Sequence, residues 1–450
     1  MRRVLLAAAL ALTPALAAPA FAQEAAAAAD RAVDVQRVVS PGGVEAWLVS
    51  DSTVPMIVVR AYWRGGAATE PQGLIGLTSV MTEMLTEGAG DLDANAFKER
   101  MEELNASLGF SSGWDGVAMN LTTLSENRDA AFEMARLALI EPRFDAPPLE
   151  RIKRQLLVGI RQRETNPAYI ANLALDEALY PGHPYARRTQ RADVDAITRG
   201  ALVERRALML PRDRMQITVV GDIDAATLGR LVDSTFGALP ASSALPEAPQ
   251  ASLQAPTPLI VRELPQPQSL ILFSAPGIQD EDPDWIPLAV ANYILGGGGF
   301  SSRLMAEVRE ARGLVYGIGT SPSVRDLVAT LRGSAQTENS DVAEAIATTR
   351  AEIARLYNEG ATQEEVDDAI TYLTGSFALD LDSNVKIASV VFGYQTAGRD
   401  IDYINQRNAR IAAVTRDDVN RVIRRLFNPD NFTFVVVGQP EGLDAGAAQN

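Results

Sequence analysis

The sequence of 450 residues contains no cysteine and a single histidine, His183. Without cysteine, the chain cannot form disulfides, iron–sulfur clusters, cysteine zinc sites or a cysteine nucleophile. With one histidine, it cannot build a zinc site from several of its own histidines. Basic residues are also scarce, because 41 Lys and Arg face 57 Asp and Glu and give a net charge of −16. Nucleic-acid binding requires clustered positive charge, so we expect no nucleic-acid partner.

The N-terminus has the pattern of a secretory signal peptide. Two arginines precede an apolar run from Val4 to Leu12, and an A-x-A cleavage motif ends at Ala22. An apolar run this short cannot cross about 30 Å of hydrocarbon, so it does not predict a membrane anchor. We expect residues 1–22 to be removed on export to the periplasm, which takes the net charge from −16 to −18. No later segment predicts a membrane span.

Over the full sequence, 47% of the residues are hydrophobic, which is the composition of a globular protein. The length is sufficient for two or three domains. Residues 23–240 predict a first domain and residues 269–441 a second one, joined by a proline-rich linker over 241–268 and followed by a tail over 442–450. The expected strands are 44–50, 56–63, 117–124 and 215–220, then 269–274, 327–334 and 432–437. The expected helices are 73–85, 92–108, 127–139, 147–163 and 169–180, then 285–295, 340–359 and 363–376.

The two halves repeat one order of elements. The clearest match is between the closing strands, M-Q-I-T-V-V-G from Met215 and N-F-T-F-V-V-V-G from Asn431. Alternating strands followed by long helices predict a duplicated α+β domain, in which a mostly antiparallel sheet is covered on one face by helices.

Three short motifs resemble catalytic or metal sites but are better explained as structural. Gly109 to Gly113 fits G-x-S-x-G, but a nucleophile elbow needs a strand before it and a helix after it, and the pattern here is the reverse. The acidic stretch from Asp91 to Glu102 lacks the turn glycine of a calcium loop and predicts a capped helix start. His183 lies in a Pro/Gly loop without a nominated nucleophile, which favours a structural role over that of a general base.

The segment from Gly296 to Tyr316 is more informative. Four glycines, Gly296, Gly297, Gly298 and Gly299, precede Phe300. No Lys-Ser/Thr follows them, which excludes a phosphate-binding loop. Such a run exposes backbone groups and lets an extended peptide approach closely. Ser301 can cap a helix that ends at Gly313, with Arg309 away from the core, and we expect Tyr316 on the strand that follows. The alternative is a surface arginine and a packed tyrosine.

The runs GGGGFSSRL…VREARGLVY and YPGHPYARRT, together with two similar domains of this length, resemble the pitrilysin-type zinc peptidases, the inverzincins. Within them, the chain is most similar to the short bacterial members related to the mitochondrial processing peptidase and to the core subunits of the respiratory bc1 complex. The resemblance covers nearly all of residues 33–438. It implies a pair of homologous domains that form half of a clamshell.

The resemblance also locates a degenerate zinc motif. In the family, a helix of the first domain carries H-x-x-E-H, with a further glutamate downstream as the third ligand. The matching positions here are Gly76, Ser79 and Val80, and the third-ligand region, 155–163, contains no carboxylate; its best match is Gly159. None of the three motif residues can bind zinc or activate water, so we expect no metal in this chain.

The resemblance further implies a role for Arg309 and Tyr316. In family members that divide the work between two chains, one carries zinc and the other supplies an arginine and a tyrosine that hold the substrate backbone. A guanidinium and a phenol can donate to a peptide carbonyl. We therefore expect Arg309 and Tyr316 to position substrate for a partner that carries H-x-x-E-H and zinc, with residues 296–300 contributing to peptide binding.

Two functions follow as hypotheses from the sequence. The first is a zinc-lacking, substrate-binding subunit of a heterodimeric periplasmic metallopeptidase. The second is a catalytically silent scaffold or binding protein that resembles the bc1 core subunits. A neighbouring gene for an H-x-x-E-H homologue would favour the first.

Overall fold

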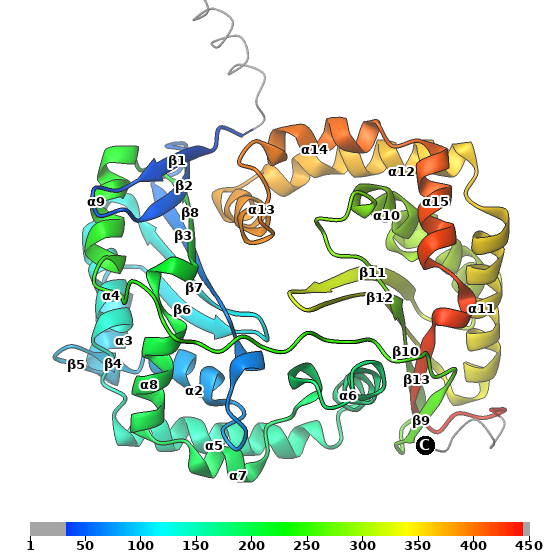
Figure 1. Cartoon of the computed structure of the whole chain (residues 1–450), viewed down its shortest axis with the longest axis horizontal. Coiled ribbons are helices and arrows are strands. Elements are labelled where there is room, and N and C mark those ends of the chain that lie inside the picture. Colours follow the sequence, from blue (N-terminus) through cyan, green and yellow to red (C-terminus); the bar gives the residue numbers. More distant parts are fainter. Residues whose placement is uncertain (1–32, 444–450) are drawn as a thin grey trace, which may run out of the picture.

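The computed structural model describes residues 33–443 and consists of two α+β halves, each built on one main sheet. Figure 1 shows the sheets on opposite sides of the molecule, with most helices on their outer faces. The expected signal peptide, residues 1–22, lies outside the described residues. Among residues 33–443, no helix combines the length and apolar character that a membrane crossing requires.

The first half contains a six-stranded sheet. Its strands are β1 (Gln36–Val39), β2 (Glu45–Ser50), β3 (Met56–Arg64), β6 (Ser107–Ser112), β7 (Gly116–Leu124) and β8 (Met215–Gly221), with a separate small pair, β4 (Gly88–Ala89) and β5 (Leu92–Asp93). Its helices are α2 (Leu77–Met84), α3 (Ala94–Glu103), α4 (Arg128–Ile140), α5 (Ala146–Arg163), α6 (Pro167–Leu179), α7 (Arg191–Ala196), α8 (Arg199–Met209) and α9 (Ala225–Phe236).

The second half contains a five-stranded sheet. Its strands are β9 (Ile260–Glu263), β10 (Gln268–Pro276), β11 (Ile318–Arg325), β12 (Val328–Glu338) and β13 (Thr433–Gly438). Its helices are α10 (Trp285–Asn292), α11 (Val342–Glu359), α12 (Gln363–Gly375), α13 (Asn384–Thr396), α14 (Tyr403–Ala412) and α15 (Arg416–Leu426), with π-helical segments over Tyr293–Gly297 and Met305–Glu310.

The strand orders match between the halves, as the sequence predicts for a duplication. The first sheet runs β1-β2-β8-β3-β7-β6, and the second runs β11-β12-β10-β13-β9, so that β9, β13, β10, β12 and β11 correspond to β2, β8, β3, β7 and β6. All pairs are antiparallel except β2 with β8 and β13 with β9. The predicted fold class, a pair of homologous and mostly antiparallel α+β domains, is confirmed.

Each sheet is covered on both faces, and the inner cover comes from the other half. Side chains alternate along β3, so that Ile57 and Val59 pack against the outer helices while Val58 faces Val391 of α13. On the second sheet, Val435 of β13 packs against Leu175 of α6. Figure 1 shows α13 beside the first sheet and α6 beside the second. The halves are therefore joined by a reciprocal exchange of helices.

Several elements differ from the expectation. The helix expected over 73–85 begins only at Leu77, because Gly73 and Gly76 have φ of 85° and 98°. The helix expected over 92–108 ends at Glu103, since Asn105 turns the chain with φ of 46° and β6 follows. Within the expected linker, 241–268, residues 241–259 and 264–267 are free of helix and strand, whereas residues 260–263 form β9 and β10 begins at Gln268.

Candidate functional site

The positions matched to the zinc motif, Gly76, Ser79 and Val80, lie at the start of α2. Glu70 caps this helix, because its side chain accepts from the backbone N–H groups of Gly76 at 2.7 Å and Thr78 at 2.6 Å. The carboxylate thereby satisfies two N–H groups that a helix start leaves unpaired. Ser79 is half-buried, whereas Val80 is fully buried in the core of the first half.

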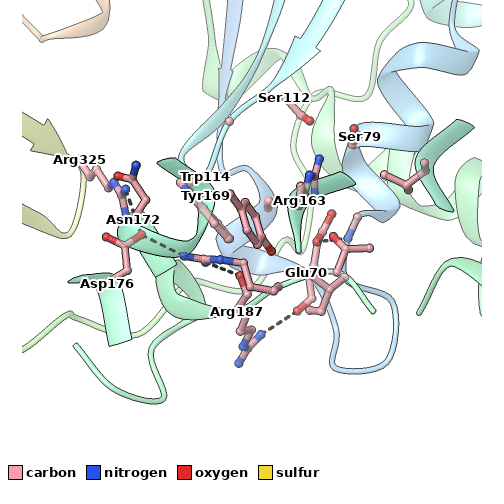
Figure 2. A pocket seen from close by; sticks show the side chains of 17 residues that line it. Glu70, Ser79, Ser112, Trp114, Arg163, Tyr169, Asn172, Asp176, Arg187 and Arg325 are labelled. Atoms are coloured by element: carbon pink, nitrogen blue, oxygen red, sulfur yellow. Dashed lines mark hydrogen bonds and ion pairs between the residues drawn. The ribbon is translucent and has the colours of Figure 1, made fainter. Parts of the chain in front are cut away.

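Gly76 and Ser79 line a pocket with a volume of about 450 Å³, and α5 contributes Leu156 and Arg163 to the same pocket. The structure thus brings the first part of the degenerate motif together with the third-ligand region, 155–163, although Gly159 is not among the lining residues. Figure 2 shows this pocket from close by.

The chemistry of the pocket does not fit zinc. The carboxylates in its lining are Glu70, which caps α2, and Asp176, which is paired with arginines. Within residues 33–443, no three His, Cys, Asp or Glu side chains are grouped so that they could hold a metal ion. The only histidine, His183, is buried: its Nε2 lies 2.7 Å from the Pro249 carbonyl and its Nδ1 accepts from the Tyr185 N–H. His183 is a structural residue, as the sequence favoured.

An ionic network on one wall of the pocket joins the two halves. Asp176 of α6 pairs with Arg188 at 3.3 Å and, across the boundary, with Arg332 of β12 at 2.6 Å and Arg325 of β11 at 3.7 Å. Burial, together with the charge of Asp176, raises the pKa of the Tyr180 hydroxyl to about 12, so this hydroxyl stays protonated and donates to the carboxylate. Because these side chains are largely buried, the pairing fixes α6 relative to the second sheet.

Arg309 and Tyr316 lie close together, with Phe300 beside them. The Arg309 guanidinium carbon is 4.5 Å from the Phe300 ring centre and 5.9 Å from that of Tyr316. Tyr316 is 89% exposed and Phe300 is 63% exposed. In the described part of the chain, Arg309 has no carboxylate partner. Tyr316 does not lie on the strand as expected, because β11 begins at Ile318.

The glycine run lies on the inner side of the second half. Gly296, Gly297 and Gly299 line a cavity of about 500 Å³ together with Asn172 and Arg332. Asn172 also lines the pocket at α2. The run and the degenerate motif therefore face adjacent parts of one interior, although they are distant in the sequence.

Most of the run also packs tightly against its own half. A Cβ at Gly296 would lie 2.6 Å from Thr320 Oγ1, and one at Gly298 would lie 2.8 Å from the Tyr293 carbonyl oxygen. The expectation that the glycines serve the approach of a peptide is therefore incomplete, because internal packing requires at least these two. Ser301 does not form the expected helix cap; at this turn Ser302 Oγ donates to the Gly299 carbonyl.

The other short motifs have the structural roles that the sequence favoured. Asp93 caps α3 by accepting from the N–H groups of Asn95 and Ala96. Ser111 lies within strand β6, which β7 follows, so the G-x-S-x-G match is not a strand-to-helix elbow. The ionic network of Asp176 and the arginines was not predicted from the sequence. The adjacent arginines Arg187 and Arg188, after His183, were the only feature of the sequence that pointed to it.

The fold is that of one half of a peptidase-type clamshell, and within residues 33–443 it contains no group of side chains that could hold a metal ion. Residues 196–373 match the family described as peptidase M16 inactive domain. A crystal structure of a peptidase M16 inactive domain from Pseudomonas fluorescens is 27% identical, has a TM-score of 0.83 and covers 93% of this chain and 99% of its own.

Curated relatives agree with that match. A protein of Helicobacter pylori named non-peptidase homolog YmxG is 24% identical over 387 residues, with 85% of this chain and 89% of the relative covered. The mitochondrial-processing peptidase subunit beta of Lentinula edodes is 22% identical over 405 residues, with 86% of each chain covered. The chain is therefore similar over most of its length to proteins of the M16 family of pitrilysin-type peptidases, which confirms the resemblance inferred from its sequence.

Proposed function

We propose that this chain is the zinc-lacking, substrate-binding subunit of a heterodimeric periplasmic metallopeptidase. Its partner would be a homologous chain that carries H-x-x-E-H and binds the zinc. The observation that carries the proposal is the cluster of Arg309, Tyr316 and Phe300. Two exposed aromatic rings hold a guanidinium that has no carboxylate partner, and this leaves its N–H groups free to donate to a peptide carbonyl.

The chemistry would be divided between the chains. A zinc-bound water on the partner supplies the nucleophile, while Arg309 and Tyr316 bind and orient the substrate backbone against it. The glycine segment 296–300 would border the same substrate path. Export rests on the signal-like pattern of residues 1–22. Two such clamshell halves would bury more than about 2,000 Å², as obligate complexes do.

The test is co-expression with the H-x-x-E-H homologue of the same organism, followed by a peptide-cleavage assay. We expect Arg309→Ala and Tyr316→Phe to lower kcat/KM of the complex by about 10- to 150-fold, the cost of one charge-assisted hydrogen bond made to substrate. Tyr316→Phe keeps the ring and removes only the donor.

Arg312→Ala is the matched control. Arg312 is exposed on the same segment and pairs with Glu307 at 2.7 Å, so its loss should leave kcat/KM within about twofold. If the two proteins do not associate, or if Arg309→Ala and Tyr316→Phe leave kcat/KM unchanged, the substrate-positioning role is wrong. A catalytically silent scaffold would then be the better description of this chain; the Helicobacter relative is named a non-peptidase homolog.

A further inference from the structure

The pocket at α2 is strongly basic for so acidic a protein. Its lining includes four arginines, Arg163, Arg187, Arg188 and Arg325, against two carboxylates, Glu70 and Asp176. The whole chain, in contrast, has a net charge of −16. Positive charge is thus concentrated at the place where the family's metal motif has been lost.

Both carboxylates are already used inside the protein. The two oxygens of Glu70 accept from the backbone at the start of α2. Asp176 is shared by Arg188, Arg325 and Arg332. Neither can neutralise Arg163, and within residues 33–443 Arg163 forms no ion pair.

The contacts of Arg163 hold its guanidinium at the pocket without using its hydrogen-bond donors. Its guanidinium carbon lies 5.6 Å from the ring centre of Tyr169, and that of Arg188 lies 5.8 Å from the same ring. Ser79, Ser112 and Trp114 line the pocket around it, as Figure 2 shows. The result is a cationic and hydroxyl-bearing floor with aromatic walls.

We propose that this pocket binds a carboxylate group of a peptide, with Arg163 as the principal anion-binding residue. The inference rests on the proposed peptide-binding function and adds to it a preference for peptides that present a carboxylate. A guanidinium binds a carboxylate in a two-point geometry, and the Ser112 hydroxyl can donate to the same group, whereas the Ser79 hydroxyl donates to Glu83 at 3.4 Å. The aromatic walls, Trp114 and Tyr169, would cover the apolar part of the residue that bears the carboxylate.

Peptide carboxylates come from acidic side chains or from a free C-terminus, and a peptide panel separates the two. The probes are ten-residue peptides of one sequence with Glu or Gln at one position, each with a free or an amidated C-terminus. Binding to the mature full-length chain is measured by calorimetry at low salt. We expect at least one carboxylate-bearing member to bind about tenfold tighter than the amidated Gln peptide, with the difference shrinking as salt rises.

The variant pair is Arg163→Gln and Arg161→Gln. Both arginines are exposed and lie in the last turn of α5, but only Arg163 lines the pocket. Arg163→Gln should abolish most of the tenfold preference and leave binding of the amidated Gln peptide unchanged, whereas Arg161→Gln should change neither. Retained thermal stability of both variants excludes misfolding as the cause.

The outcomes separate this inference from the function on which it rests. Equal binding of all four peptides would overturn the carboxylate pocket and leave peptide binding intact. Absence of binding by every peptide, together with no cleavage by the mixed complex, would overturn both. If Arg163→Gln does not reduce the preference for carboxylate-bearing peptides, the carboxylate binds elsewhere and this site is refuted.

Discussion

At the residue scale, the glycines of the run at 296–299 differ in what they do. Gly299 has φ of 56° and open space around its Cβ position, whereas Gly296 approaches Thr320, whose hydroxyl is bonded to Asn292 at 2.8 Å. A side chain at Gly296 would therefore displace a buried polar pair. In the sequence the four glycines are equivalent. Only the neighbouring strand β11 distinguishes Gly296, which is closely packed, from Gly299, which has open space around it.

We therefore predict that Gly296→Ala lowers the free energy of unfolding by about 1–3 kcal/mol, the usual cost of overpacking. Gly317→Ala is the control, because a Cβ there meets nothing within 4 Å. Denaturant titration of both variants measures the difference. If Gly296→Ala unfolds at the same denaturant midpoint as the wild type, the close approach of Gly296 to Thr320 does not restrict the side chain at this position.

The residue scale also shows which parts of the site the sequence could predict. That the residues at 76, 79 and 80 cannot bind zinc follows from the sequence, because the side chains of Gly, Ser and Val are not zinc ligands. The proximity of Arg309 to Tyr316 follows from short sequence spacing. The basic pocket could not be predicted from the sequence, because Arg163, Arg188 and Arg325 belong to separate segments that come together only in the folded structure.

At the element scale, strong periodicity predicted the long elements and failed at the short or edge ones. The expected strand over 56–63 and helix over 147–163 agree with β3 and α5 within one residue at each end. The strand expected at Tyr316 is β11, which begins two residues later; it is an edge strand that tolerates Gly319 and Pro322, residues that weaken a strand pattern.

Helix α15 lies in the helical region expected before the closing strand but was given no bounds, although its start carries a capping box. Thr415 Oγ1 accepts from the Asp418 N–H at 3.2 Å, and the Asp418 side chain accepts from the Thr415 N–H at 3.1 Å. Hydrogen bonds from Thr415, followed by those from Arg421, lower the pKa of Asp418 from 3.8 to about 2. Folding therefore gains stability from the ionised carboxylate above the unfolded pKa of 3.8 and loses it as pH falls through about 2.

We predict that Thr415→Ala lowers the free energy of unfolding by about 1 kcal/mol at pH 7, as the loss of an N-cap usually does. The gap between wild type and variant should narrow as pH falls from about 4 to 2, because protonation of Asp418 weakens in the wild type the bond from the Thr415 hydroxyl to the carboxylate, which the variant lacks. Denaturant midpoints across this pH range test the expectation. A gap that is independent of pH would mean that Asp418 does not contribute through its charge.

At the scale of the whole molecule, the exchange of α6 and α13 makes the halves interdependent. Arg60 of β3 donates to Ser389 of α13 at 2.8 Å, and Thr218 of β8 donates to Gln395 of α13 at 2.8 Å. Apolar clusters surround both exchanged helices. The repeated elements could be predicted from the sequence, but the exchange of α6 and α13 could not. The local pattern of apolar residues does not indicate which of the two sheets a helix covers.

The network at Asp176 is the polar part of this junction, and it supplies the last prediction. Asp176 is 3% exposed and is the only carboxylate that pairs with Arg188, Arg325 and Arg332 within residues 33–443. Asp176→Asn keeps the shape but leaves three partly buried guanidinium groups without a counter-charge. Removing one partner of a buried ionic network costs about 3–5 kcal/mol.

We expect Asp176→Asn to lower the free energy of unfolding by about 3 kcal/mol, whereas Asp129→Asn, at an exposed carboxylate 3.7 Å from Arg230, should change it by less than about 0.5 kcal/mol. Because the exchanged helices tie each sheet to the other half, both halves of the wild type should unfold in one transition, followed by tryptophan fluorescence and circular dichroism together. Two separated transitions in the wild type, or equal effects of the two substitutions, would contradict this coupling. A single transition that splits in two only in Asp176→Asn would instead identify this carboxylate as the group that makes the unfolding of the two halves cooperative.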